Sequence, residues 1–202
     1  MKSESAGRAI RGDRWPRERA LDRARRVLRG VYGHDDFRPA QRAAVGATLA
    51  GRDLMAVLPT GSGKSVCFQI PALMGRQLHV VVTPLVALMQ DQVTGLRGRG
   101  VHAAAAIHGG MSRRLRRERI REAADGGLRL LYVAPERLRS PGLLPALRRR
   151  RVGRVVVDEA HCISQWGHDF RPAYRRIGEF ASRIGSPPVA AFTATATPRV
   201  ER

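Results

Sequence analysis

The apolar and polar residues of the chain follow two alternating periods. Short apolar runs rich in branched residues are typical of buried strands, and apolar residues at every third or fourth position are typical of helices that bury one face. The predicted strands cover residues 54–58, 78–83, 101–107, 128–133, 152–157 and 189–192. The predicted helices cover residues 17–29, 39–50, 85–96, 112–124, 143–150 and 171–184, and a further helix that begins at Lys64 is expected to kink or end at Pro71.

These elements form a regular series in which strands and helices alternate. Such a series implies right-handed βαβ crossovers and a mainly parallel sheet with helices on both faces. The predicted fold class is therefore α/β, and a length of 202 residues suits one domain. In sheets of this kind ligands bind beyond the carboxyl ends of the strands. We therefore expect the functional residues at those strand ends.

A glycine-punctuated turn follows the first predicted strand and leads into a helix. It consists of Pro59, Thr60, Gly61, Ser62, Gly63, Lys64 and Ser65. Glycines let the backbone approach an oxyanion closely, and the N–H groups at the start of a helix point at it. This context predicts a loop that binds the phosphates of ATP, with Lys64 on the β- and γ-phosphates and the Ser65 hydroxyl on Mg²⁺. Leu58 replaces the first glycine of the standard motif, and a plain turn between strand and helix is the alternative.

The use of lysine in the chain supports the phosphate loop. Of 37 Lys and Arg residues, Lys2 and Lys64 are the only lysines. A compact ammonium fits a tight phosphate cradle better than a flat guanidinium does. Lysine at this one interior position is therefore consistent with phosphate binding.

Two adjacent carboxylates, Asp158 and Glu159, directly follow the fifth predicted strand. At the carboxyl end of the sheet they are expected beside the phosphate loop, where Asp158 would hold Mg²⁺ and Glu159 would orient and deprotonate the attacking water. His161 follows on the same turn, and Thr193 and Thr195 end the last strand with hydroxyls suited to relaying a change at His161. A charged pair or a threonine-rich segment that merely ends a strand is the structural alternative.

The charge of the chain favours a polyanionic partner. The formal net charge is +20 and the pI is about 11.7, and such a charge promotes association with nucleic acid through steering and counterion release. An arginine-rich composition inherited from the coding sequence could produce part of this charge. The arginine runs at 113–121 and 148–151 are interpreted as solvated faces.

The remaining composition indicates an intracellular protein. Cys67 and Cys162 have no metal-binding spacing and are expected to be reduced thiols. No apolar run approaches the roughly 18 residues of a membrane span, so no membrane partner and a cytoplasmic location are expected. Residues 1–16 are polar and basic and are expected to be disordered.

Six segments together resemble the first RecA-like lobe of RecQ-family DNA helicases, which are superfamily-two helicases with a DEAH box. These segments are 37–41 (FRPAQ), 59–65 (PTGSGKS), 83–93 (TPLVALMQDQV), 132–138 (YVAPERL), 158–172 (DEAHCISQWGHDFRP) and 191–198 (AFTATATP). Other helicases share Asp-Glu-Ala-His, but the aromatic tail after it resembles RecQ proteins alone. The resemblance covers about residues 17–202 and implies a P-loop NTPase lobe.

The resemblance also implies how adenine and DNA are bound. Gln41 would read the adenine edge and Arg38 would pack near the base, although His34 and Ala40 replace an aromatic residue and a glycine of the family pattern. Four residues would form an aromatic-rich loop that senses single-stranded DNA and signals to the ATP site: Trp166, His168, Phe170 and Arg171. Aromatic rings stack on bases with little sequence preference, at about 1–3 kcal/mol per base. Thr83, Pro84 and residues 90–92 would lie along the DNA.

The function implied by the resemblance is that of an ATP-dependent helicase that unwinds DNA in the 3′ to 5′ direction during recombination and repair. The expected partners are single-stranded DNA, duplex junctions and a second RecA-like lobe, in the same or another chain. An arginine finger from that lobe contributes about 10³ to 10⁵ in rate, so residues 17–202 alone are not expected to unwind DNA. A DNA-binding remnant that does not use ATP and an RNA-directed ATPase of the DEAH type are the alternatives.

Overall fold

The computed structural model describes residues 18–163 and 172–194. Its strands form one six-stranded sheet in the order β1-β6-β5-β2-β4-β3, and every neighbouring pair is parallel. The strands are β1 (Leu54–Val57), β2 (Leu78–Val82), β3 (Ala104–Ile107), β4 (Leu130–Val133), β5 (Val152–Val157) and β6 (Val189–Thr193). The predicted α/β class with a parallel sheet is confirmed.

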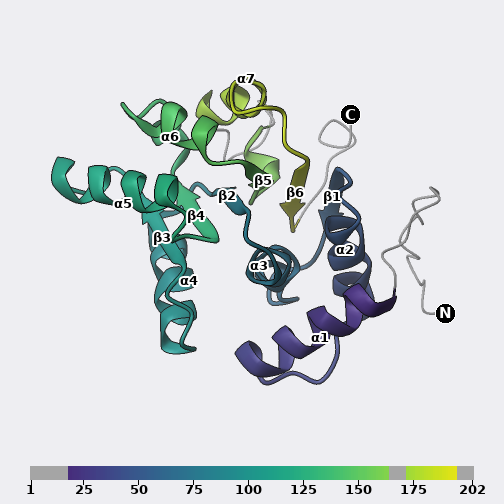
Figure 1. Ribbon diagram of the computed structural model, residues 1–202. Coiled ribbons are helices and arrows are strands. Elements are labelled where there is room, and N and C mark those ends of the chain that lie inside the picture. Colours follow the sequence, from purple (N-terminus) through teal and green to yellow (C-terminus); the bar gives the residue numbers. More distant parts are fainter. Residues whose placement is uncertain (1–17, 164–171, 195–202) are drawn as a thin grey trace.

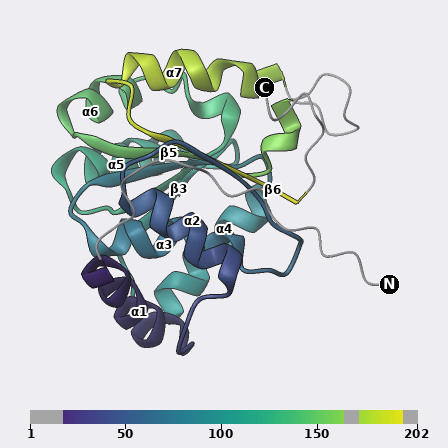
Figure 2. The ribbon, with the colours of Figure 1, turned by 90° about the vertical axis from the view of Figure 1, so that its right-hand side faces the viewer.

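Helices cover both faces of the sheet, as Figures 1 and 2 show. One face packs against α1 (Glu18–Tyr32), α2 (Pro39–Leu49), α3 (Lys64–Met74) and α4 (Val86–Gly98). The other face packs against α5 (Arg113–Asp125), α6 (Leu143–Arg149) and α7 (Ile177–Arg183). Three short 3-10 helices lie between these elements: η1 (Pro135–Arg137), η2 (Ala160–Ile163) and η3 (Pro172–Arg176). None of the helices in the described ranges is both long and apolar enough to span a membrane.

Alternate residues of the central strands enter opposite cores. Val81 on β2 is buried in the core beneath α1–α4, whereas its neighbours Val80 and Val82 are buried beneath α5–α7. Because both faces are covered, a central strand can be apolar at every position, and all five residues of β2 are buried. This explains why the central strands β2 and β5 are largely apolar in sequence, interrupted by His79 in β2 and Arg154 in β5.

The structure differs from the sequence-based predictions at some element boundaries. Pro71 lies inside α3, which continues to Met74, so the prediction that this helix could end at the proline was wrong. Burial of Ile70, Pro71 and Ala72 favours the helix there despite the N–H that proline lacks. β3 begins at Ala104 and not at residue 101. The helix predicted over 171–184 is divided between η3 and α7.

The parallel topology brings the carboxyl ends of all six strands to one edge of the sheet, here called the carboxyl rim. The segment 58–63 leaves β1 at this rim and enters α3, and residue 158 leaves β5 there. Thr193 ends β6 between them, and residue 83 follows β2. The motifs that lie far apart in the sequence are therefore adjacent in space.

A buried arginine fastens α2 to the amino-terminal side of the sheet. Arg154 on β5 is 2% exposed and donates to the carbonyl oxygens of Arg52, at 2.9 Å, and Thr48, at 3.0 Å. Thr48 lies in the last turn of α2, where a cation is favoured by the helix dipole. Burial lowers the pKa of Arg154 to about 10, so the guanidinium stays charged at neutral pH.

His79 lies beside this arginine, because β2 and β5 pair with His79 opposite Arg154. Its side chain is buried, and Nδ1 has no hydrogen-bond partner in the described part of the chain. Burial, together with the charge of Arg154, lowers the pKa of His79 from 6.5 to about 4. The imidazole is therefore neutral in the folded protein at pH values where it is protonated in the unfolded chain.

This histidine should make the folded state less stable in mild acid. The unfolded chain takes up a proton near pH 6.5 and the folded chain only near pH 4, so the contribution of His79 falls by about 2 kcal/mol between pH 7.5 and pH 5. We expect His79→Val to lose this part of the pH dependence when urea unfolding is measured at both pH values. Asp158, whose pKa is raised, titrates in both proteins and cancels in the comparison. The same pH dependence in both proteins would contradict this account.

Candidate functional site

The predicted phosphate loop lies at the carboxyl rim between β1 and α3. Gly61 and Gly63 have φ angles of 76° and 77°, a left-handed conformation that glycine adopts without strain. The N–H of Ser62 donates to Pro59 O at 3.1 Å. Among the described residues, the N–H groups of Gly61, Gly63 and Lys64 have no acceptor. These donors, at the positive end of the α3 dipole, can bind an anion.

A second observation indicates that the loop is built to hold a polar group. The hydroxyl oxygen of Ser62 is buried and has no hydrogen-bond partner within the described ranges. A buried polar atom without a partner is costly in a folded protein, and a ligand in the loop could supply the partner that this hydroxyl lacks. The donors of the loop therefore suit a phosphate chain.

Gln41 on α2 connects the start of that helix to the phosphate loop. Its side chain is buried, and Nε2 donates to Ser62 O at 2.7 Å and to Gly63 O at 3.4 Å. Its Oε1 accepts the backbone N–H of Arg38 at 2.9 Å. Both N–H donors of the Gln41 amide are thus engaged, so Nε2 could donate to adenine only by giving up one of these bonds, whereas Oε1 keeps a second lone pair. Adenine recognition by Gln41, and by the exposed Arg38, stays a prediction.

Asp158 directly follows β5 and is 5% exposed. Its Oδ1 accepts the backbone N–H of Glu159 at 3.1 Å, and its Oδ2 accepts the Thr83 hydroxyl at 3.4 Å. Burial, and secondly the negative charge of Glu159, raises the pKa of Asp158 from 3.8 to about 6. A cation placed beside this carboxylate would therefore be bound with a gain in electrostatic energy.

Glu159 faces the phosphate loop from β5. Its Oε1 lies 3.6 Å from Lys64 Nζ, and the two side chains are only 21% and 12% exposed. The backbone of Glu159 has a φ of 49°, an uncommon conformation for a residue with a side chain. The structure thus brings together the lysine and the acidic pair that the sequence predicted at one rim.

His161 continues this chain of contacts toward β6. Its Nδ1 lies 3.3 Å from Glu159 Oε2 and 3.0 Å from the Thr193 hydroxyl oxygen. A continuous polar path therefore crosses the ends of β1, β5 and β6. It consists of Lys64, Glu159, His161 and Thr193. A shift of the Glu159 carboxylate could therefore displace Thr193 through two contacts, that of Glu159 with His161 and that of His161 with Thr193.

Several predicted residues belong to segments 164–171 and 195–202. Five of them lie outside the described residues: Trp166, His168, Phe170, Arg171 and Thr195. Their predicted roles in DNA binding and in coupling stay predictions. Ser65 and Thr60 lie in the described loop, as expected, but the structure assigns them no partner that would test their roles.

The sequence analysis missed two residues that support the acidic pair. Tyr174 on η3 is buried and its hydroxyl donates to Asp158 O at 2.8 Å. Thr83 was predicted on the DNA path, yet its buried hydroxyl reaches Asp158. No local sequence pattern indicates either contact, because each contact joins residues on different elements.

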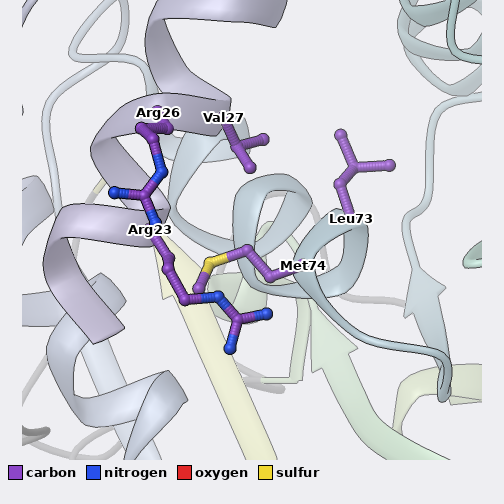
Figure 3. Close-up of a pocket in the computed structure, with 5 residues that line it drawn as sticks. All are labelled: Arg23, Arg26, Val27, Leu73 and Met74. Atoms are coloured by element: carbon purple, nitrogen blue, oxygen red, sulfur yellow. The ribbon is translucent and has the colours of Figure 1, made fainter. Parts of the chain in front are cut away.

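A cavity of about 330 Å³ lies away from the rim (Figure 3). It is lined by Arg23, Arg26 and Val27 of α1 and by Leu73 and Met74 of α3. The last two residues end α3, whereas the phosphate loop precedes its first turn. The cavity is therefore separate from the polar path at the rim.

Comparisons with known proteins agree with this site. A model of the DEAD/DEAH box helicase family matches residues 38–202. The chain is 47% identical over 176 residues to the ATP-dependent DNA helicase RecQ of Synechocystis sp., which covers 84% of this chain and 37% of that protein. It is 41% identical over 177 residues to the probable ATP-dependent DNA helicase RecS of Bacillus subtilis, which covers 88% of this chain and 35% of that protein. The chain thus spans about a third of the length of these relatives.

Solved helicase structures share the fold. A hypothetical ATP-dependent RNA helicase from Sulfolobus tokodaii superposes with a TM-score of 0.67 at 21% identity, over 92% of this chain and 53% of that one. The helicase MrfA bound to DNA superposes with a TM-score of 0.68 at 20% identity, over 93% and 28%. Because the family match includes both the phosphate loop and the acidic pair, the chain belongs to the DEAD/DEAH box helicase family, and within it the chain is similar to the RecQ helicases, as its motifs predicted.

Proposed function

We propose that the chain is the ATP-binding lobe of a RecQ-type DNA helicase that couples ATP hydrolysis to 3′ to 5′ movement on single-stranded DNA. The observation that carries this proposal is the meeting of Lys64 with Glu159 at 3.6 Å, beside the buried Asp158. A lysine, two carboxylates and unpaired loop N–H groups at one sheet edge are the parts that phosphoryl transfer requires. The names of the similar RecQ and RecS proteins support the same activity.

The loop and Asp158 would hold ATP with Mg²⁺. Lys64 and the N–H groups of Gly61 and Gly63 would bind the phosphate oxygens, and the Ser65 hydroxyl and Asp158 would hold the metal, Asp158 through its waters. Hydroxyl and carboxylate oxygens are the hard donors that Mg²⁺ prefers, and the raised pKa of Asp158 fits a carboxylate that a cation would stabilise. Bound Mg²⁺ would neutralise charge that develops on the transferred phosphoryl group.

Glu159 would orient the attacking water and take its proton. In the structure this carboxylate contacts Lys64 and His161, so ATP binding would have to draw Lys64 toward the phosphates. Glu159 would then keep its contact with His161, and that ring would report the change to Thr193. In this way the polar path links the phosphates to the end of β6.

DNA is the proposed polyanionic partner, in agreement with the net charge of +20. The lobe would consist of residues 17–202, and residues 1–16 would remain disordered. Five residues would take part in DNA sensing: Trp166, His168, Phe170, Arg171 and Thr195. Unwinding would need a second RecA-like lobe, from the same or another chain, which supplies an arginine finger. We place this activity in the cytoplasm, in recombination and repair at single-stranded DNA and duplex junctions.

Substitution of the paired residues should separate binding from hydrolysis. Lys64→Ala removes a charge-assisted contact to phosphate and should weaken ATP binding about 10-fold or more. Glu159→Gln keeps the shape of the side chain and removes the base, so it should leave ATP affinity within about threefold while abolishing residual hydrolysis. Titration of a fluorescent ATP analogue with Mg²⁺ and measurement of phosphate release on the 202-residue chain would test both.

Competition experiments distinguish the alternative functions. DNA binding that ignores ATP would indicate a remnant that binds DNA without using nucleotide, and preference for RNA over DNA of the same sequence would indicate an RNA-directed ATPase. Vigorous hydrolysis by the 202-residue chain alone would show that no second lobe is needed.

The Gln41 contact with the phosphate loop can be tested with a matched pair of glycines. Gly61 and Gly63 share nearly the same positive φ, so an alanine at either position carries the same backbone strain, about 1 kcal/mol. A Cβ at Gly63 would lie 2.6 Å from Gln41 Nε2, whereas a Cβ at Gly61 meets nothing within 4 Å. We therefore expect Gly63→Ala to lower the free energy of unfolding by about 1–2 kcal/mol more than Gly61→Ala does.

The Gln41→Ala substitution supplies the control. Because it removes the amide that the new Cβ would displace, Gly63→Ala should cost no more than Gly61→Ala when Gln41 is already alanine. Urea unfolding of the single and double variants gives these values. Equal effects of the two glycine substitutions in the otherwise unchanged chain would show that Gln41 does not hold the loop.

A further inference from the structure

A buried glutamine on α3 joins four elements through its amide group. Gln69 is 4% exposed and its Nε2 donates to the hydroxyl of Tyr132, at 2.7 Å, and to Oε1 of Gln92, at 3.2 Å. Its Oε1 accepts the hydroxyl of Tyr32 at 2.5 Å. Both donors and the acceptor of one side chain thus connect α3 with α1, α4 and β4. We call Gln69 and these three partners the Gln69 node.

The protons of the node are fixed at neutral pH. Burial raises the pKa of both tyrosines, so Tyr32 and Tyr132 remain protonated. Tyr132 is fully buried and would be costly to leave without a partner in the core. The Gln69 amide can therefore shift only if its partners move with it or a hydrogen bond is lost.

Two helices in the node lead to the carboxyl rim. Gln69 follows Lys64 on α3 by five residues, about 7.5 Å along the helix axis, and so lies on the helix that the phosphate loop enters. Gln92 lies on α4, which starts at the rim after β2. Leu85 and Leu88, at the start of α4, are 44% and 40% exposed, so this end of the helix presents apolar surface beside the site.

The end of α4 is also fastened to the node. The guanidinium carbon of Arg99, directly after α4, lies 5.4 Å from the centre of the Tyr32 ring, a distance suited to a cation–π contact. Arg99 also donates to Gly95 O within α4 at 2.7 Å. Tyr32 thus touches both the middle of α3 and the end of α4.

We propose that Gln69 is a positioning residue that couples the phosphate loop to α4, so that nucleotide binding and single-stranded DNA binding alter each other's affinity. The inference rests on the proposed function, which places ATP at the loop and DNA on this lobe, and on the resemblance to RecQ helicases, which implies DNA along residues 90–92. Hydrogen bonds of 2.7 and 3.2 Å lengthen beyond a useful distance when one helix slides by about 1 Å. A movement of α3 that follows phosphate binding is therefore transmitted to Gln92 or breaks its bond to Gln69.

The variants that test this coupling differ in which arm of the node they remove. Gln69→Met keeps the length of the side chain and removes every hydrogen bond, and Gln92→Met removes the α4 arm alone. Tyr32→Phe is the matched control, because it removes a hydrogen bond to Gln69 but leaves the bond between Gln69 and Gln92 in place. Gln92 is only half-buried, so Gln92→Met carries the test if Gln69→Met does not fold.

The quantity to measure is the ratio of nucleotide dissociation constants without and with saturating oligo-dT, on the 202-residue chain with a fluorescent ATP analogue and Mg²⁺. For the unchanged chain we expect a ratio that differs from 1 by about fivefold or more. Gln69→Met and Gln92→Met should both bring the ratio to within about twofold of 1. Gln69→Met should keep the affinity for each ligand alone within about threefold. Gln92→Met should do so for the nucleotide alone, whereas its affinity for oligo-dT alone should fall, because residue 92 lies on the expected DNA path. Tyr32→Phe should keep the original ratio. A merely structural role of Gln69 would change stability without changing this ratio.

Each other outcome is informative. A ratio near 1 in the unchanged chain, with both ligands bound, overturns the coupling, as does an unchanged ratio in Gln69→Met or Gln92→Met. Failure of the unchanged chain to bind the nucleotide at all would instead refute the proposed function, so the two failures are distinguishable.

Discussion

The ion pair between Lys64 and Glu159 depends on the parallel arrangement of the strands. β1 and β5 are separated in the sheet by β6, and their carboxyl ends reach the same rim because every strand runs in the same direction. An antiparallel arrangement of either strand would place the lysine and the carboxylate on opposite edges. The βαβ crossovers that enforce parallel pairing are therefore the physical basis of the site.

The two faces of the sheet have different chemistry. Beneath α5–α7 the core is almost entirely apolar, whereas the face beneath α1–α4 buries Gln41, Gln69, His79 and Arg154. Each of the amide and guanidinium groups among them joins elements through hydrogen bonds. Such bonds are directional, and a small displacement of one helix alters its partners. The face that carries the phosphate loop is thus suited to transmitting movement, and the apolar face is suited to resisting it.

The sequence predicted the elements and the rim motifs because both are local patterns. Apolar runs identified all six strands, and the glycines around Ser62 and the carboxylates after β5 marked the rim. Contacts between distant residues have no such pattern. Gln69 follows the phosphate loop as one polar residue in an apolar helix, and nothing near it indicates Tyr132 or Gln92 as partners. The same applies to Tyr174, whose bond to Asp158 O depends on how η3 packs.

The structure also indicates what nucleotide binding must change. Lys64 is neutralised by Glu159, and the loop carbonyls of Ser62 and Gly63 are held by Gln41. In the proposed function a triphosphate would compete with the first contact, because Lys64 could not approach the γ-phosphate and keep its full interaction with the carboxylate. Adenine competes with the second if it takes the Gln41 amide. The base and the phosphates would therefore release two restraints on the same loop, one at each end of the ligand. Such an arrangement would make the loop sensitive to a complete nucleotide, since either part alone would leave one restraint in place.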